Sequence, residues 1–407
     1  MEQTIQLDLE TIENFYSNEY FKVCKILNCM AGLWPYKGYM DKLLRRVIVS
    51  IVILGILFVP YLRGVKKWCG KNLAACSEDI AGTVFASGVF LKYLVTFINE
   101  KKLIQVYEEV ARNHLALDDP AEQAIMAKWS MDGKIKYMGY LGYLTLAGVS
   151  FSQMIIVPQM LDLVVPLNES RQRVTITMAD FGIDSDQYFY TIYVTYCVVS
   201  VVSFFVLTSI DTMYTAIIHQ ILGIFNVVKY RLLNVQTANF GLNKGNDKTG
   251  RDISSLNVIS AIRLHHKSLQ FIDLIESTYR YCFLILIFIC VIFLSFGSIT
   301  VLEAVNELYN FLRLGIVLFG VAVHLFYLSW PGQLVIDESS DVFRATYEST
   351  WYDMPKRTQV LIDIMMMRCR QPCSLTAGGL YVMSFENYGK IIKTTGSYIT
   401  VLASFRG

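Results

Sequence analysis

Long apolar runs are the feature that most constrains this chain. Residues 47–62 read VIVSIVILGILFVPYL and residues 282–297 read CFLILIFICVIFLSFG. Each approaches the ~20 residues that a helix needs to cross the hydrocarbon of a bilayer. Hydrophobic residues make up 54% of the 407 residues and charged residues only 17%, against roughly 25% charged in soluble domains. The sequence therefore predicts an all-α, polytopic membrane protein.

Seven membrane helices are predicted from the apolar runs. The second carries Glu78, Asp79 and Lys92, so we expect it to border a protein-lined cavity or the interface rather than lipid. Helical character in the fourth continues from Gln187 to about Val235, about 72 Å of helix, so this helix must project beyond the bilayer. The predicted ranges are 46–63, 73–98, 135–162, a fourth from about 187, 279–303, 311–336 and 375–405.

The fifth helix also extends beyond its membrane span. Residues 264–282 precede that span and carry one apolar side at helical spacing,. Helices that project from the membrane with an apolar side must bury it. The pattern predicts an anchor bundle below the membrane and indicates association of subunits.

Two signals predict a cytoplasmic N-terminus. Most Lys and Arg residues lie in the N-terminal segment and in every second loop, which the positive-inside rule assigns to the cytoplasm. The sequon Asn168-Glu169-Ser170 falls in the loop between the third and fourth helices, where an N-glycan at Asn168 requires an extracellular loop. Seven spans then place the C-terminus outside the cell, the opposite of a G-protein-coupled receptor.

The nine cysteines do not indicate a metal site. Cys369 and Cys373 are four apart and lack a second pair,. Cys69 and Cys76 share a short loop and could form a disulfide if that loop faces outside, but spacing alone does not establish the geometry. A net charge of +2 implies no nucleic acid partner.

Catalytic motifs such as H-E-x-x-H and G-x-S-x-G do not occur in the sequence,. The adjacent His265 and His266 would point about 100° apart on a helix, a poor arrangement for chelation. We expect them on the cytoplasmic helix surface or in the anchor. Asp211 and His324 are expected to pair within the bundle. The chain is not predicted to be an enzyme, and no cofactor is implied.

Five short motifs follow one another in the last third of the chain. They are Asp337-Glu338-Ser339, the stretch Trp351-Tyr352-Asp353-Met354-Pro355, Arg368 to Pro372, Ala377-Gly378 with Ser384, and Ser397-Tyr398 with Leu402. In this order they resemble the C-terminal third of insect odorant receptors. The loop between the fourth and fifth helices is much shorter than in the co-receptor of that family, so we interpret the chain as a ligand-tuning subunit.

The resemblance implies a tetrameric, odorant-gated, nonselective cation channel that contains olfactory co-receptor subunits, in the plasma membrane of olfactory sensory neurons. It also implies that the seventh helices line one central pore and that the cytoplasmic ends of helices four to seven form the anchor between subunits. The expected organisation is a cytoplasmic segment 1–45, helices one to six with a ligand pocket in their outer half over 46–336, an anchor region 337–386, and a pore-lining part 387–407.

Polar residues in the predicted seventh helix fit a pore. Ser397, Val401 and Phe405 share one helix face at spacings of four residues, with Thr394 and Ser404 beside it,. Apolar constrictions can gate by dewetting, and Val401 with Phe405 match the apolar gating pair of the family. The alternative is that both side chains face lipid or pack against the sixth helix.

The predicted ligand is a small, largely apolar volatile molecule, because the outer halves of four helices offer aromatic residues, Met and few charges. Ordinary helix packing is the alternative for each position. The candidates are Phe85, Val89 and Phe90 in the second helix, Tyr143, Ala147 and Met154 in the third, Tyr193 and Cys197 in the fourth, and Leu325 and Phe326 in the sixth.

Three other membrane protein classes are alternatives to this interpretation. A gustatory receptor shares the architecture, but its terminus carries Gln-Phe after the Tyr, which this chain lacks after Ser397-Tyr398. A G-protein-coupled receptor has the opposite orientation, and its D-R-Y and N-P-x-x-Y elements do not occur at the ends of spans three and seven. A secondary transporter would show an internal duplication, which the sequence does not.

Overall fold

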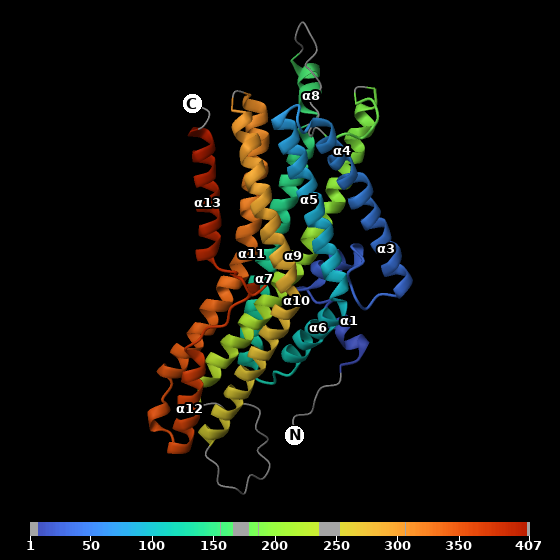
Figure 1. Cartoon of the computed structure of the whole chain (residues 1–407). Helices are drawn as coiled ribbons and strands as arrows, with labels where there is room; N and C mark the ends of the chain where they lie inside the picture. Colours follow the sequence, from blue (N-terminus) through green and yellow to red (C-terminus); the bar gives the residue numbers. More distant parts are fainter. Residues whose placement is uncertain are drawn as a thin grey trace.

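The computed structural model describes residues 7–154, 156–165, 179–185, 187–235, 253–305 and 307–404. These residues form an elongated bundle whose long helices run along one axis (Figure 1). The upper end carries α8 and the turn between α4 and α5, and the lower end carries α12. We use upper half and lower half in this sense below.

The elements of the first half of the chain are all helical. They are α1 (Leu9–Phe15), α2 (Lys22–Met30), α3 (Tyr39–Ile51), the π-helix η1 (Val52–Phe58), α4 (Val59–Trp68), α5 (Leu73–Ile98), α6 (Glu100–Leu115), α7 (Pro120–Gln153) and α8 (Val157–Val164).

The second half contains the longest helices and one small sheet. Its elements are α9 (Phe189–Leu233), α10 (Ile253–Glu303), α11 (Leu308–Glu348), the 3-10 helix η2 (Trp351–Asp353), α12 (Lys356–Cys369), β1 (Thr376–Ala377), β2 (Tyr381–Val382) and α13 (Phe385–Ser404).

Side-chain caps mark the start of several helices. The carboxylates of Asp8 and Asp119 and the side-chain oxygen of Asn72 accept hydrogen bonds from backbone N–H groups in the first turns of α1, α7 and α5. Such caps satisfy donors that have no partner inside the helix. The first membrane helix is continuous through α3, η1 and α4. Its π-helical segment directly precedes Pro60, whose missing N–H frees a carbonyl in the preceding turn.

The predicted seven-helix, all-α fold is confirmed, with α3–α4, α5, α7, α9, α10, α11 and α13 as the seven helices. By length and composition alone, five described segments suffice to cross a membrane, which leaves α7 and α13 as the two more polar members. Helix α9 is central, because it packs against α7, α10 and α11, while α5 packs mainly on α10.

Four predicted boundaries are wrong, and one of them is the end of the sixth helix, which runs to Glu348 rather than to about residue 336. The third helix begins at Pro120 rather than near residue 135, and it ends at Gln153 before the short α8, which carries a proline in its first turn. The predicted connections near 99–134 and 337–374 contain the helices α6 and α12.

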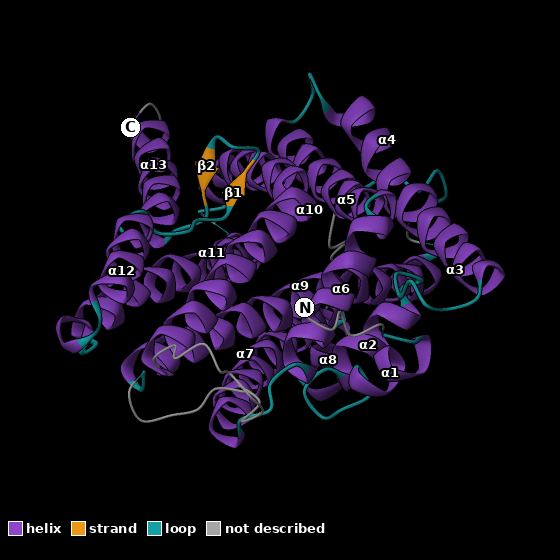
Figure 2. Ribbon diagram, turned by 90° about the horizontal axis from the view of Figure 1, so that it is seen from below, coloured by secondary structure: helices purple, strands orange, loops and turns teal. Residues whose placement is uncertain are grey.

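The fourth wrong boundary concerns the seventh helix, which starts at Phe385 and not at residue 375. The preceding residues form an antiparallel hairpin in which Thr376 pairs with Val382 and Ala377 with Tyr381. Gly378 and Gly379 make its turn with φ of 64° and 75°, a backbone region that glycine enters without a steric penalty. The hairpin lies between α10 and α13 (Figure 2), and the Gly378 N–H donates to the Arg280 carbonyl at 2.9 Å.

Candidate functional site

A cavity of about 350 Å³ lies among the upper halves of α5, α7, α9, α10 and α11. Helices α5, α7, α9 and α10 contribute residues at spacings of three and four, which is the pattern of one helix face, whereas α11 contributes a nearly continuous run over 313–321 and His324,. On α5 these run from Glu78 to Val89, on α9 from Tyr196 to Leu207, and on α10 from Leu286 to Thr300. Most of the wall is aromatic or aliphatic, so the cavity fits a small and largely apolar ligand.

An ion pair lies in the cavity wall toward the upper end. The Arg313 guanidinium on α11 donates from Nη2 to Glu78 Oε2 on α5 at 3.0 Å. Arg313 is buried and the Glu78 side chain is 15% exposed. The pair therefore ties the upper ends of α5 and α11 together across the cavity.

A second polar group closes the cavity toward its lower end. The Tyr140 hydroxyl lies 2.6 Å from His324 Nδ1, and both residues line the cavity. Below them Asp211 lies 3.8 Å from His324, bonds with Lys92, and accepts from Tyr140 at 3.4 Å. The predicted pairing of Asp211 and His324 is confirmed, but the closer partner of Asp211 is Lys92, which sequence reasoning did not pair with it.

Four of the predicted ligand positions line this cavity, namely Phe85, Val89, Tyr143 and Ala147. The structure places the remaining six elsewhere. Tyr193 packs with Phe189 beside the cavity, Leu325 is fully buried in the core, and Phe326 stacks on Phe385. The others that do not line it are Phe90, Met154 and Cys197.

Sequence reasoning missed the whole contribution of α10. Its lining residues, Leu286, Ile289, Cys290, Phe293, Gly297 and Thr300, lie inside a run that is apolar on all sides, so hydropathy does not mark the inward face. Glycine is the one usable signal. Gly82, Gly88, Gly297 and Gly320 all line the cavity, and at Gly82 a Cβ atom would lie 2.3 Å from the Tyr61 ring.

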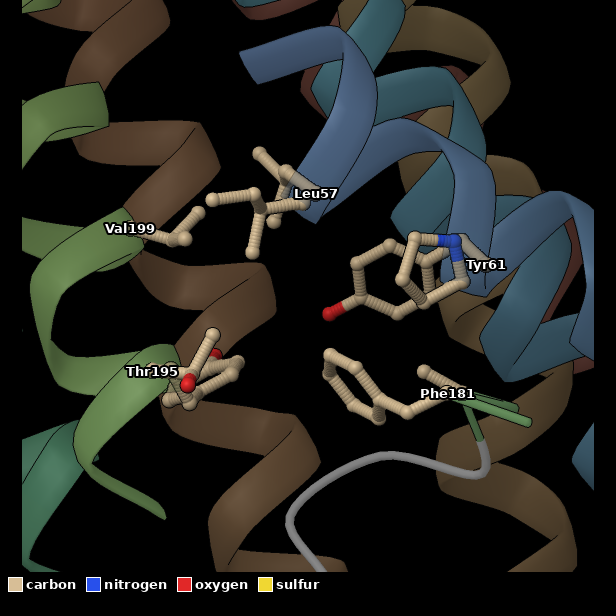
Figure 3. A pocket seen from close by; sticks show the side chains of 9 residues that line it. Leu57, Tyr61, Phe181, Thr195 and Val199 are labelled. Atoms are coloured by element: carbon tan, nitrogen blue, oxygen red, sulfur yellow. The ribbon is translucent and has the colours of Figure 1, made fainter. Parts of the chain in front are cut away.

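A smaller void adjoins the cavity near the upper end. Leu57, Tyr61 and Tyr196 belong to the walls of both. Phe181, from the segment before α9, faces Tyr61 and Thr195 across this void (Figure 3). The main cavity is thus separated from the segment 179–185 by only one layer of side chains.

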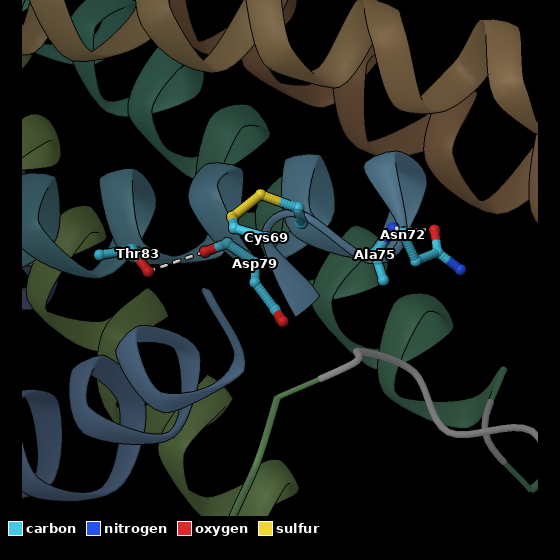
Figure 4. Close-up of a disulfide and its surroundings, with 6 residues drawn as sticks. Cys69, Asn72, Ala75, Asp79 and Thr83 are labelled. Atoms are coloured by element: carbon cyan, nitrogen blue, oxygen red, sulfur yellow. Dashed lines mark hydrogen bonds between the residues drawn. A yellow bond between two sulfur atoms is a disulfide. The ribbon is translucent and has the colours of Figure 1, made fainter. Parts of the chain in front are cut away.

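Cys69 and Cys76 form a disulfide, with Cα atoms 4.9 Å apart. The sequence alone leaves this bond as one of two possibilities. It links the end of α4 to the first turn of α5 (Figure 4). One turn further on, the Thr83 hydroxyl donates to the Asp79 carbonyl at 2.7 Å. The disulfide fixes the corner from which α5 descends along the cavity.

Helix α13 stands at the edge of the bundle (Figures 1 and 2). One side packs against α10 and α11, while Thr394, Ser397, Val401 and Ser404 are exposed. These four are the described members of the predicted pore face, because Phe405 lies outside the described residues, as does the predicted glycosylation site Asn168. Lys390 lies lower on the helix and pairs with Glu386 at 2.7 Å.

The lower bundle brings together residues of the sequence motifs. Glu338 accepts from Lys229 at 2.6 Å and from Asn226 at 2.7 Å, and the Ser339 hydroxyl accepts from the Cys373 N–H at 2.9 Å. These bonds join α11 to α9 and to the segment after α12.

Residues of the lower bundle show little chemical reactivity. His265 is buried, with Nε2 3.8 Å from the Cys369 sulfur on α12, so its expected contact with the anchor is present. Burial raises the pKa of the Cys369 thiol to about 12, which keeps it protonated and unreactive. Within the described part of the chain, no three His, Cys, Asp or Glu side chains are grouped to hold a metal ion.

Comparisons with known proteins agree with this architecture. The insect olfactory receptor OR5 from Machilis hrabei, solved in complex with eugenol, superposes with a TM-score of 0.76 over 95% of this chain and 100% of that chain, at 15% identity. Odorant receptor Or2 of Anopheles gambiae is 22% identical over 93% of this chain and 97% of its own length.

A third relative matches over a shorter region. Odorant receptor 10 of Aedes albopictus is 26% identical over 44% of this chain, and the match spans about half of that relative, 47% of its length. A family model described as 7tm Odorant receptor matches residues 68–396, which include all of the cavity wall except Leu57 and Tyr61 and nearly all of the sequence motifs. The chain therefore belongs to the seven-transmembrane odorant receptor family.

Proposed function

We propose that this chain is the ligand-tuning subunit of an odorant-gated, nonselective cation channel, and that the odorant binds in the cavity between α5, α7, α9, α10 and α11. The observation that carries the proposal is this cavity of about 350 Å³ in the upper half of an odorant receptor fold. Its volume lies at the small end of the roughly 300–1,000 Å³ usual for ligand pockets, so the ligand class is small volatiles.

The proposal assigns the ion pathway to α13. Its exposed side carries Thr394, Ser397, Val401 and Ser404, and in a tetramer four such sides would face one another. Val401, together with Phe405, would form the apolar gate. The charge of Lys390 is offset by its ion pair with Glu386, so this lysine does not oppose cation entry by itself.

The proposed tetramer contains olfactory co-receptor subunits and sits in the plasma membrane of olfactory sensory neurons. Its upper half would face the extracellular side, where odorants arrive, and the lower bundle would be the cytoplasmic anchor between subunits. Ligand binding opens the pore only if the ligand has a higher affinity for the open arrangement than for the closed one. Helices α10 and α11 touch both the cavity and α13, so they are the elements that would couple the two.

Whole-cell recording tests the ligand site. Cells expressing the chain together with a co-receptor are exposed to a panel of volatiles, and the variant Gly320→Leu is compared with Gly315→Leu on the same helix. Gly320 lines the cavity and Gly315 does not, and a Cβ atom at Gly315 meets no atom within 4 Å. Leucine at 320 should fill the cavity and raise the half-maximal concentration at least about tenfold, roughly 1.4 kcal/mol.

The control variant should keep wild-type sensitivity and both variants should reach the cell surface. Equal sensitivity of Gly320→Leu and wild type would show that ligands bind elsewhere. A wild-type chain that responds to no volatile in the panel, although it reaches the surface with the co-receptor, would contradict the receptor function itself.

Cysteine accessibility tests the pore. Val401→Cys should react with a small charged thiol reagent during activation, and the reaction should block the current. Thr395→Cys, on the side of α13 that is partly buried against the bundle, is the matched control and should not be blocked. If Val401→Cys keeps its full current after treatment and Thr395→Cys is labelled instead, the pore is lined by another face of α13.

A further inference from the structure

We propose that the cavity selects neutral ligands that carry one hydrogen-bonding oxygen, and that the Ser203 hydroxyl is the group that binds this oxygen. The inference rests on the proposed function, because it presupposes that the ligand occupies the cavity. It adds a chemical class of ligand, namely small alcohols, ketones and esters, and a residue that distinguishes them from hydrocarbons of the same shape.

Ser203 lies in the cavity wall on α9 and is 2% exposed. Its Oγ atom is buried and has no hydrogen-bond partner among the described residues. A buried hydroxyl without a partner is unfavourable, because it has left water and gained no bond. Native proteins satisfy most such groups, and the exceptions are often functional.

Neighbouring hydroxyls on the same helix behave differently. Thr208 donates to the Phe204 carbonyl at 2.7 Å, Ser209 to the Val206 carbonyl at 2.9 Å, and Thr212 to the Thr208 carbonyl at 2.7 Å. Bonds of this kind to the preceding turn are the usual solution for Ser and Thr inside helices. The helix therefore offers a general way to satisfy a hydroxyl, and Ser203 does not use it.

Several other polar groups of the cavity wall are already engaged, and Ser203 is the wall hydroxyl among the described residues that is both buried and without a partner. The Tyr140 hydroxyl lies against His324, the Arg313 guanidinium against Glu78, and the Thr300 hydroxyl donates to the Gly297 carbonyl at 2.8 Å. Ser203 is thus a wall residue whose hydroxyl would gain a bond from a ligand without losing one to the protein. The proposal requires the Ser203 side chain to adopt a staggered χ1 that turns its Oγ toward the cavity.

The surroundings of Ser203 determine the kind of ligand. Phe204 and Leu207 beside it in the wall on α9 are apolar, as are Val89 and Phe293 on other helices, and Ser200 is the polar wall residue one turn before it. A charged ligand would lose its hydration without a free counter-charge, because Glu78 and Arg313 neutralise each other,. A neutral molecule with one oxygen fits both the largely apolar wall and the buried, unbonded hydroxyl of Ser203.

Three probes of nearly the same shape test the inference: acetophenone, 1-phenylethanol and isopropylbenzene. They carry a carbonyl, a hydroxyl and a methyl group at the same position. Dose–response currents are recorded from cells that express the chain with a co-receptor, and the linear set 2-heptanone, 2-heptanol and 2-methylheptane is run in parallel. Wild type should respond to the oxygen-bearing members at concentrations about tenfold lower than to the hydrocarbon of the same set.

The Ser203→Ala variant should remove this preference. Its half-maximal concentration should rise about tenfold for the oxygen-bearing probes and stay unchanged for the hydrocarbons. Ser209→Ala is the matched control, because Ser209 is buried on the same helix, bonded to its own backbone, and not part of the cavity wall. Ser203→Thr keeps the hydroxyl and should keep the preference for oxygen, which guards against a folding defect in the alanine variant.

Distinct outcomes separate this inference from the proposed function. Equal responses to the members of both sets, or an equal loss for hydrocarbons and oxygen-bearing probes in Ser203→Ala, would overturn the role of Ser203 and leave the cavity as ligand site. If Gly320→Leu changes none of these dose–response curves, the cavity is not the ligand site. If wild type responds to neither probe set but does respond to volatiles of other shapes, and all of those active volatiles are hydrocarbons, the inference is also overturned.

Discussion

The upper and lower parts of α9 differ sharply in how they are surrounded. Every residue from 206 to 225 is buried, whereas between 189 and 205 only Phe189, Val199 and Ser203 are. The lower part is enclosed by α2, α6, α7, α10 and α11, while the upper part borders the cavity. One continuous helix thus combines a densely packed scaffold with a loosely packed half that has room for a ligand.

The border between the two parts is polar. Asp211 and Lys92 are almost fully buried and bonded to each other, directly below the Tyr140 and His324 pair that closes the cavity. Ionisable groups inside a membrane bundle are expensive and usually serve a function. Here the charge pair fixes α5 to α9 at the level where the cavity ends.

The largest expected effect comes from breaking this border. Lys92→Met leaves the Asp211 carboxylate in the bundle without its cation, and loss of one partner of a buried pair destabilises by about 3–5 kcal/mol. We expect little folded receptor at the cell surface. The double variant Lys92→Met/Asp211→Leu removes both charges and should recover much of the surface expression and of the melting temperature of the purified protein.

Arg45→Met serves as the control for this experiment, because Arg45 forms an exposed pair with Asp41 and such pairs contribute about 0–1 kcal/mol. Should the double variant fold no better than Lys92→Met, the defect would come from lost packing of the lysine stem rather than from the unpaired carboxylate.

The second prediction compares the same substitution in both halves. Leu222 is fully buried in the lower part of α9, and Leu318 is a half-buried wall residue of the cavity. Leu222→Ala should destabilise by about 3 kcal/mol, because it leaves a new void in close packing. Leu318→Ala should cost about 1 kcal/mol, because it only enlarges a space that already exists. Thermal melting in detergent measures both, and equal losses would show that the upper half is packed as tightly as the lower.

Much of this contrast could be predicted from the sequence, and the reasons are specific. The length of the apolar pattern from Gln187 to Val235 indicated that α9 projects beyond the membrane, and α9 spans Phe189–Leu233. The charges of the second helix indicated a protein-lined environment, and Lys92 is buried while Glu78 lines the cavity. Length and charge are properties of the chain itself, so these predictions needed no knowledge of neighbouring helices.

The direction in which a helix faces could not be predicted in the same way. On α9 the cavity wall includes Tyr196 and Ser200 but not the intervening Cys197, and one residue of rotation moves a side chain by about 100°. On α10 apolar residues surround the helix, so no sequence pattern distinguishes lipid from ligand. The hairpin before α13 was missed because its turn depends on two consecutive glycines with positive φ, inside a stretch that otherwise reads as helix.

The smallest expected effect concerns a single methyl group placed in each half. At Gly133 on α7 a Cβ atom would lie 2.8 Å from the Cβ atom of His219 on α9, whereas at Gly320 the nearest atom is the Tyr143 hydroxyl at 3.8 Å. Gly133→Ala should force the two lower helices apart and destabilise by about 1–2 kcal/mol. Gly320→Ala should stabilise by up to about 1 kcal/mol, because alanine favours the helix and fits the open space. The melting temperature should therefore fall for Gly133→Ala and rise for Gly320→Ala. A lower melting temperature for both variants would mean that the cavity closes around Gly320 in the folded receptor.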